Sequence, residues 1–112
     1  MMSLDFNDVL TMLYGLSWVE RQTLEFILKE GKPVTASKLS ETLKVDKAVI
    51  SRALNNLLRK GLIKRTRIKE KDKRSLFAYY VDDKEFKNKV WEDTERFLES
   101  IKTSVQSYLS NP

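Results

Sequence analysis

The chain has 112 residues, a length typical of one domain, and a net charge of +5 from 21 basic and 16 acidic residues. It contains no cysteine and no histidine, which excludes disulfides, thiolate or imidazole metal ligands, and Ser–His or Cys–His catalysis within the chain. No apolar run approaches the ~18 residues that a membrane span needs, and the start of the chain lacks the basic segment of a signal peptide. We therefore expect a single cytoplasmic domain over residues 1–112, with no cofactor, metal or membrane contact. Composition alone does not exclude catalysis by carboxylates, but no motif points to it, so we expect no enzymatic activity.

The charge is distributed very unevenly along the chain. Residues 44–74 hold 12 of the 21 basic residues and only three acids, a net charge of +9, whereas the remaining residues carry nine basic and 13 acidic residues, a net charge of −4. A basic block in an otherwise acidic chain favours a surface that binds a polyanion. The alternative from charge alone is a solvated, lysine-rich surface of a heat-tolerant protein.

Two helices are predicted before residue 32. Apolar residues at helical spacing predict the first helix over residues 4–14, and Gly15 ends it. Ser17 and Glu20 form a capping box that begins the second helix, and Gly31 ends that helix. One broad face of this second helix is apolar and carries Trp18, Val19, Leu24, Ile27 and Leu28.

A helix-turn-helix is predicted next. After a short extended piece, Thr35 caps a helix over residues 36–43, in which Leu39 and Leu43 are expected to be buried. Lys44 and Val45 form a tight turn. Asp46 then caps the helix 47–60, on which Ile50, Leu54 and Leu57 share one face.

A β-hairpin and a long helix complete the chain. The segments 62–68 and 75–81 are rich in β-branched and aromatic residues and predict two strands, joined by a wholly charged tip over residues 69–74. Asp82 or Asp83 caps a last helix that runs to about residue 110, and its apolar stripe is longer than so small a domain can cover. We therefore expect the helices 4–14 and 84–110 to form the interface of a homodimer.

The outward face of the helix 47–60 has the chemistry of a helix that enters the major groove of DNA. It combines small residues with hydrogen-bonding ones and includes no acid and no large apolar residue. Arginine can bond guanine through two hydrogen bonds and asparagine can bond adenine, while small residues allow close approach to the groove. A solvent-exposed face that is merely basic is the alternative for this helix taken alone, and its place between a preceding helix and a following hairpin favours DNA binding.

Two further segments are expected to contact DNA. The hairpin tip would reach the flanking minor groove, and Asp72 would pair with Arg74 to hold its direction; a turn charged only for solubility is the alternative. The start of the helix 36–43 would contact phosphate, because helix N-termini favour anions. The complete set of expected DNA-binding residues is Thr35, Ser37, Lys38, Lys47, Ala48, Ser51, Arg52, Asn55, Arg59, Lys71, Lys73 and Arg74.

The run from Val45 to Ile63, with its Ile-Ser-Arg step, its leucine and its Arg-Lys-Gly-Leu-Ile ending, resembles winged-helix regulators of the MarR and TrmB-type families. Asp72-Lys73-Arg74 is similar to the Asp-x-Arg motif of MarR wings, and Leu16-Ser17 is similar to the start of TrmB-type domains. The resemblance covers residues 16–81. It implies a mainly α fold with a small β-hairpin (α+β), a winged helix-turn-helix, and transcriptional regulation by a homodimer that binds double-stranded DNA. The length and the Lys/Glu-rich composition are typical of small archaeal regulators.

Two other functions are open on the sequence. A winged helix can serve as a protein–protein interaction module without DNA contact. Such a module should expose large apolar residues on the second helix of the helix-turn-helix, residues 47–60, and this helix exposes none. An enzyme would need a carboxylate pair, and the densest acids, Asp82, Asp83 and Glu85, are better explained as helix caps. Aromatic residues near the terminal helices could line a pocket for a small-molecule effector, although such residues are more often core or interface residues.

Overall fold

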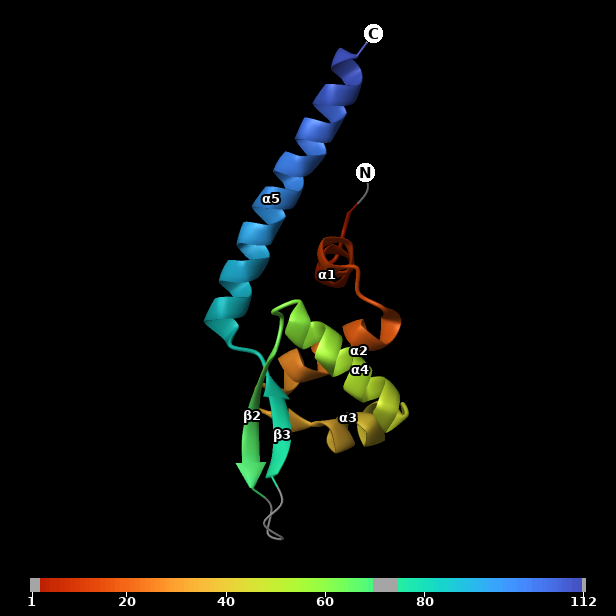
Figure 1. The fold of residues 1–112 in the computed structure, drawn as a ribbon, viewed down its shortest axis with the longest axis vertical. Helices are drawn as coiled ribbons and strands as arrows, with labels where there is room; N and C mark the ends of the chain where they lie inside the picture. The colour runs from red at the N-terminus through yellow and green to blue at the C-terminus, as the bar shows by residue number, and fades with distance from the viewer. Residues whose placement is uncertain (1–2, 70–74, 112) are drawn as a thin grey trace. The chain divides into compact units, whose positions relative to one another are not determined.

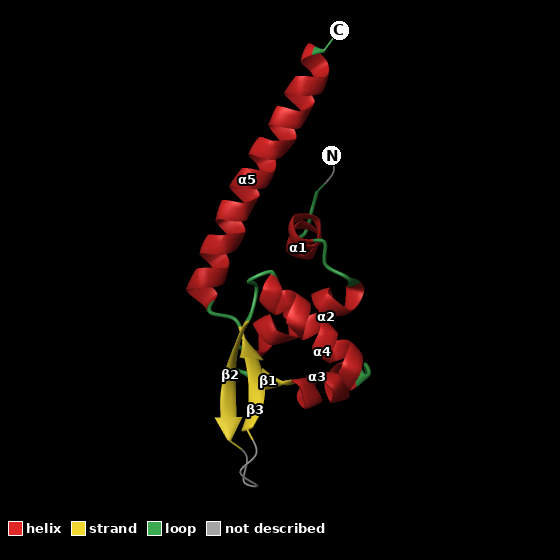
Figure 2. Ribbon diagram, in the orientation of Figure 1, coloured by secondary structure: helices red, strands yellow, loops and turns green. Residues whose placement is uncertain are grey.

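The computed structural model describes residues 3–69 and 75–111 of the chain. Two compact units are present, Met1–Asp82 and Asp83–Pro112, and each is described by itself. In chain order the elements are α1 (Phe6–Tyr14), α2 (Trp18–Glu30), β1 (Val34–Thr35), α3 (Ala36–Leu43), α4 (Lys47–Arg59), β2 (Lys64–Lys69), β3 (Ser75–Tyr80) and α5 (Asp83–Ser110) (Figures 1 and 2). Within the described residues, five helices and a small antiparallel sheet confirm the predicted mainly α fold with a β-hairpin.

Local sequence signals fix the ends of α1 and α2. Asp5 and Ser17 each accept a hydrogen bond from the third helical residue, and the side chain of that residue accepts one in return from the backbone of the cap. Gly15 and Gly31 end the two helices in the left-handed region, at φ 62° and 68°. The predicted helix boundaries are therefore confirmed to within two residues.

The sheet has three strands in the order β1-β3-β2. The hairpin pairs Arg65 with Tyr79 and Arg67 with Phe77, and β1 adds two pairs on the other edge of β3, Val34 with Tyr79 and Thr35 with Ala78. The sequence predicts only a short extended piece before α3, because two residues carry no readable periodicity. Pairing through β1 attaches the start of α3 to the central strand of the sheet.

The core of the first unit lies between α2, α3, α4 and the sheet. Full burial of a leucine or isoleucine side chain contributes about 1.5–3 kcal/mol to folding, so these contacts dominate the stability of the unit. The predicted apolar line of α4, Ile50, Leu54 and Leu57, is fully buried. The other side chains at or below 2% exposure are Leu10, Leu24, Ile27, Leu39, Leu62, Ala78 and Thr23.

Several local predictions need correction. The strand predicted from residue 62 begins at Lys64, because Leu62 and Ile63 are buried in the core directly after Gly61. The helical period places Trp18 with the apolar face of α2, yet it is the first residue of the helix and is 60% exposed. Leu43 is only half-buried.

Asp46 occupies the N-cap position of α4 as expected, but its side chain makes no capping hydrogen bond. Only its backbone carbonyl takes part, accepting from the Ile50 amide at 3.0 Å. The predicted carboxylate cap is therefore wrong in its chemistry, although the boundary is right.

The second unit consists of α5, whose 28 residues span about 42 Å at 1.5 Å per residue. Its buried residues, Phe86 and Val90, lie in its first turns. Toward its end the large apolar side chains are exposed, among them Leu98, Ile101 and Val105.

Candidate nucleic-acid interface

The turn between α3 and α4 sets the position of α4. Lys44 adopts the left-handed conformation at φ 55° and ψ 44°, the usual conformation of a glycine that ends a helix. The Val45 amide donates to the Ser40 carbonyl at 3.2 Å, and the Ser40 hydroxyl donates to the Val45 carbonyl at 2.6 Å. This closed turn joins two helices of the kind found in DNA-binding proteins.

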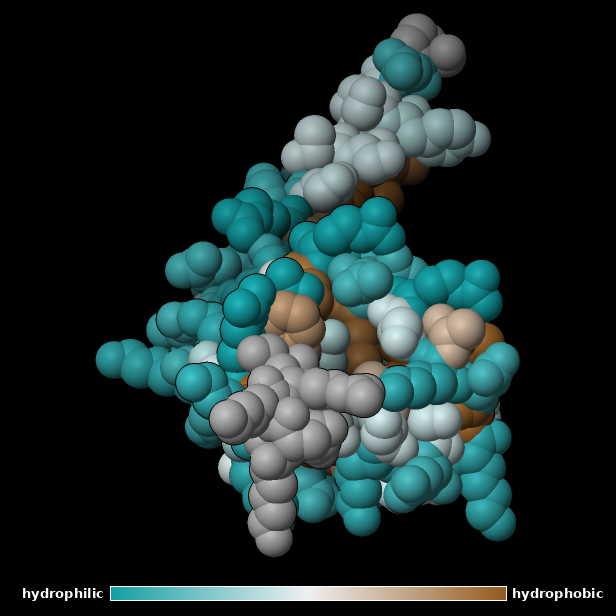
Figure 3. Space-filling model, turned by 60° about the horizontal axis from the view of Figure 1, so that its bottom comes forward, coloured by the Kyte–Doolittle hydropathy of each residue, from teal (hydrophilic) through white to brown (hydrophobic). Residues whose placement is uncertain are grey.

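The outward face of α4 is exposed along its whole length. Its solvent-exposed residues include six of the predicted contacts, Lys47, Ala48, Ser51, Arg52, Asn55 and Arg59. Among the described residues of this face none is an acid or a large apolar residue. In Figure 3, hydrophilic side chains (teal) cover much of the visible surface, with smaller hydrophobic patches (brown) between them.

The three predicted residues of α3 lie at the helix start. The Thr35 hydroxyl accepts from the Lys38 amide at 3.2 Å and thereby caps the helix, as predicted. Ser37 and Lys38 are exposed, whereas Thr35 is half-buried. The Thr35 oxygen is thus already engaged by the backbone, and Ser37 and Lys38 are the more accessible of the three.

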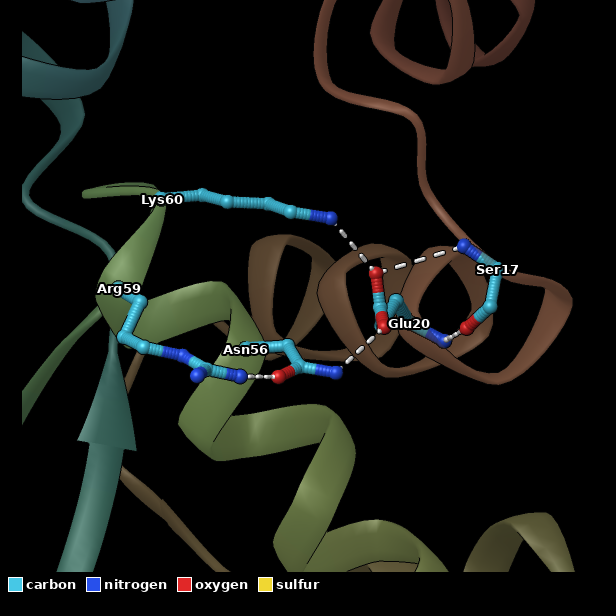
Figure 4. Close-up of polar contacts among 5 residues, drawn as sticks. All are labelled: Ser17, Glu20, Asn56, Arg59 and Lys60. Carbon is cyan, nitrogen blue, oxygen red and sulfur yellow. Dashed lines mark hydrogen bonds and ion pairs between the residues drawn. The ribbon is translucent and has the colours of Figure 1, made fainter.

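A buried carboxylate attaches the C-terminal end of α4 to the start of α2. Glu20 is 7% exposed, and Asn56 Nδ2 donates to its Oε2 at 3.0 Å, while Lys60 Nζ lies 3.1 Å from its Oε1 (Figure 4). Asn56 Oδ1 in turn accepts from a guanidinium nitrogen of Arg59. Through this chain of contacts a residue of α2 orients a predicted DNA contact on α4.

The electrostatics of Glu20 follow from the same contacts. Burial by itself raises the pKa of its carboxyl group. Hydrogen bonds from Asn56, Lys60 and the Ser17 backbone amide, together with the charge of Lys60, outweigh burial, so the pKa lies below its usual range. Glu20 is therefore charged at neutral pH and binds a neutral donor in α4, Asn56, and a positive donor directly after α4, Lys60.

The first wing strand, β2, carries two arginines beside an aromatic ring. Arg65 and Arg67 lie on the same side of β2, and their guanidinium carbons lie 4.3 Å and 5.4 Å from the centroid of the Phe77 ring. Such stacking holds a guanidinium group in place while its N–H groups stay available. The predicted wing contacts Lys71, Lys73 and Arg74 lie outside the described residues, as does the predicted pairing of Asp72 with Arg74.

Sequence reasoning misses three residues of this surface. The sequence indicates Glu20 only as a helix cap and Asn56 only as an edge residue of its helix. It counts Arg65 in the basic block but does not assign it to the face. Alternation along β2 is the available signal for Arg65, since it places Arg65 and Arg67 on one side of the strand.

Within the described ranges no group of acidic side chains could hold a metal ion, and no helix is long and apolar enough to cross a membrane. The side chains of the surface carry guanidinium, ammonium, amide and hydroxyl groups, which bind anions and hydrogen-bond acceptors.

Comparison with solved structures identifies the fold. A possible transcriptional regulator from Methanosarcina mazei Go1 superposes with a TM-score of 0.80 at 15% identity, covering 96% of this chain and 91% of that chain. A protein from the thermoacidophilic archaeon Sulfolobus tokodaii gives a TM-score of 0.66 at 20% identity, covering 84% of this chain and 92% of that chain. The transcriptional regulator BldR from Sulfolobus solfataricus gives a TM-score of 0.54 at 23% identity, covering 96% of this chain and 70% of that chain. Comparison with curated proteins gives no match.

The model of the MarR family matches residues 14–75, more than half of the chain. The chain belongs to the MarR family. The matched segment runs from the end of α1 to the start of β3 and so contains the helix-turn-helix and the first wing strand. The resemblance of residues 45–63 to MarR-type winged helices is confirmed.

Proposed function

We propose that this MarR-family protein is a homodimeric transcriptional regulator that binds double-stranded DNA sequence-specifically in the cytoplasm. Residues 47–60 would enter the major groove, and the wing, residues 69–74, would contact the adjacent minor groove. The observation that carries the proposal is the outward face of α4, which is exposed, basic and free of large apolar side chains. The alternative, a winged helix that docks on a protein without DNA contact, would need apolar or aromatic anchors on that face.

Individual side chains on this face have distinct roles in the proposal. Arg52 and Asn55 lie one turn apart and would bond base edges, guanine and adenine respectively. Ala48 and Ser51 would allow the helix backbone to approach the groove. Lys47 and Arg59, at the two ends of α4, would contact phosphate and fix the register of the helix in the groove.

The contacts at the rim of this surface extend the same proposal. Ser37 and Lys38 at the start of α3 would bind backbone phosphate, with Thr35 beside them. In the wing, Lys71, Lys73 and Arg74 would follow the width and the negative potential of the minor groove rather than base identity.

The dimer rests on the exposed stripe of α5. Trp91, Leu98 and Val105 are spaced seven residues apart, and Thr94, Ile101 and Tyr108 repeat the same spacing three residues later. The five large apolar side chains of this set are between 43% and 80% exposed. A heptad repeat of this kind is the pattern of a helix that pairs with another helix of the same sequence.

Charge favours an antiparallel arrangement of the two α5 helices. In this arrangement Leu98 faces Ile101 of the partner subunit across a two-fold axis, and Glu95 lies beside Lys102 of the partner subunit. The two-fold axis generates a second, equivalent pair between Lys102 and Glu95 of the partner subunit. A parallel arrangement instead sets Lys102 beside Phe97 of the partner subunit and forms no such pair. In the part of the chain that the structure describes, the ion pairs along α5 join Lys87 to Asp83 and join both Lys89 and Arg96 to Asp93. None of these pairs involves Glu95 or Lys102.

The N-terminal helix would add to this interface. Leu4, Phe6 and Met12 lie in or next to α1 and are each about half exposed. Exposed apolar side chains at both ends of the chain fit an interface built from both terminal helices, residues 4–14 and 84–110.

A footprint of the protein on DNA tests the proposal. Duplexes that bind would be selected from a random-sequence pool and probed by chemical footprinting with the dimeric protein. We expect a pseudo-palindromic site with two protected half-sites about one helical turn, ~34 Å, apart. Protection of one unrepeated half-site would contradict the homodimer, and failure to select any sequence would contradict sequence-specific binding.

A further inference from the structure

An open hollow of about 640 Å³ lies between α4 and β2. Among the described residues that line it, three are arginines and none is acidic. The residues that line it are Arg52, Asn55, Asn56, Leu58 and Arg59 from α4 and Arg65 from β2. The hollow lies entirely within the first unit.

Two of these guanidinium groups are held in position before any ligand binds. Arg65 is stacked 4.3 Å from the Phe77 ring centroid, and Arg59 is hydrogen-bonded to Asn56, which Glu20 fixes from α2 (Figure 4). Arginines that are already oriented lose little side-chain freedom on binding, and their planar N–H groups match the oxygens of a phosphate.

The proposed docking geometry indicates which part of the DNA would occupy the hollow. The major and minor grooves of a duplex are separated by a sugar–phosphate strand. If α4 lies in the major groove and the hairpin reaches the next minor groove, that strand must pass between α4 and the hairpin. Arg65 and the outward arginines of α4 lie on the two sides of this path.

We propose that the hollow is a seat for backbone phosphates of the DNA strand that separates the two grooves, and that Arg65 is a DNA-binding residue. This inference rests on the proposed DNA binding and specifies how the wing strand takes part in it. Arg65 contributes affinity without sequence preference, because phosphate is the same at every step of the duplex. Arg52 and Asn55, which are proposed to bond base edges, also line the hollow.

The chain offers a matched control for the test. Arg67 lies two residues further along the same strand and near the same ring, but it does not line the hollow. Arg65→Gln and Arg67→Gln remove the same charge from the same strand face, so general attraction to DNA falls equally in both variants. Any further difference between the two variants should come from a defined phosphate interaction that only Arg65→Gln removes.

The experiment measures binding of each variant to a selected site and to random duplex over a series of salt concentrations. For Arg65→Gln we expect roughly tenfold weaker binding on both duplexes and a log–log salt slope that is shallower by about 0.9 for each phosphate that the variant no longer neutralises. For Arg67→Gln we expect the slope to stay near that of the unaltered protein. Arg65→Lys should fall between the two, since it keeps the charge but not the paired N–H groups.

The outcomes separate this inference from the function on which it rests. Binding by the unaltered protein with equal slopes for Arg65→Gln and Arg67→Gln would overturn the phosphate seat alone. A weakening confined to the selected site would also overturn it, because it would make Arg65 a base-reading residue. If the unaltered protein bound no duplex, both the proposed function and the seat would fail. Thermal unfolding of each variant shows that the fold is kept.

Discussion

The outward faces of α4 and α5 are both exposed, yet they differ in chemistry. The face of α4 presents arginine, asparagine, serine and alanine, whereas α5 presents a heptad of large apolar side chains, from Trp91 to Tyr108. A polar, basic face suits a hydrated polyanion, and an apolar stripe of period seven suits a second helix. In the proposed function, the face of α4 would bind DNA and the face of α5 would bind a second copy of the chain.

The largest expected effect concerns the stripe of α5. Leu98→Asp would place a charge in the centre of the proposed helix pair, and desolvation of that charge should weaken dimerisation by at least about 100-fold. Sedimentation equilibrium measures the change. Ser100→Asp, which adds the same charge outside the heptad positions, is the control and should remain a dimer. If Leu98→Asp stayed dimeric, the stripe would not be the interface.

The next effect concerns the face of α4. Arg52→Ala should weaken binding to a selected site by about 1–3 kcal/mol, roughly 5- to 150-fold, because it removes a paired hydrogen bond to a base. Random duplex should be affected much less. Equal weakening on both duplexes in a competition titration would remove Arg52 from base reading and leave it as a phosphate contact.

A smaller effect is expected at the attachment of α4 to α2. Glu20→Gln should lower the free energy of unfolding at pH 7 by about 1–3 kcal/mol, because charged hydrogen bonds to Asn56 and Lys60 are weakened. The folded pKa of Glu20 is lowered, so its contribution is complete above the unfolded pKa of about 4.3 and is lost as the pH falls through the folded value.

Denaturant unfolding from pH 7 down to pH 3 measures this dependence. The difference between Glu20→Gln and the unaltered protein should narrow as the pH falls below about 4.3. A constant difference over the whole range would show that Glu20 acts through its shape and not through its charge.

The smallest effect concerns the orientation of the α5 pair. Glu95→Lys or Lys102→Glu alone should weaken the dimer by a few-fold, because exposed ion pairs contribute about 0.2–1 kcal/mol each. The double variant should restore the original affinity in the antiparallel arrangement. A parallel pair would show no such rescue in the dimer dissociation constant.

Most of the fold could be predicted from local signals. The capping box of Ser17 and Glu20, the glycines that end α1 and α2, and the threonine cap of α3 all lie within a few residues of what they determine. The buried line of α4 follows from its 3.6-residue period. Such features need no knowledge of distant contacts, which explains why the helices agree with their predicted positions.

The features that could not be predicted depend on contacts between distant residues. The contact of Asn56 with Glu20 joins residues 36 positions apart, and Arg65 belongs to the α4 surface only because the sheet brings β2 beside that helix. The two-residue strand β1 is defined by its pairing with β3 rather than by its own pattern. The candidate site could therefore be predicted where it lies on one helix, and not where it is built from several elements.

DNA binding by a dimer can be measured first by a salt titration of binding to random duplex DNA, run beside the sedimentation mass of the protein. We expect a dimer that binds at low salt, with a log–log slope of about −4 or steeper, because several phosphates are contacted by each subunit. A folded dimer that binds no duplex at low salt would rule out the DNA-binding function and favour the protein-interaction module.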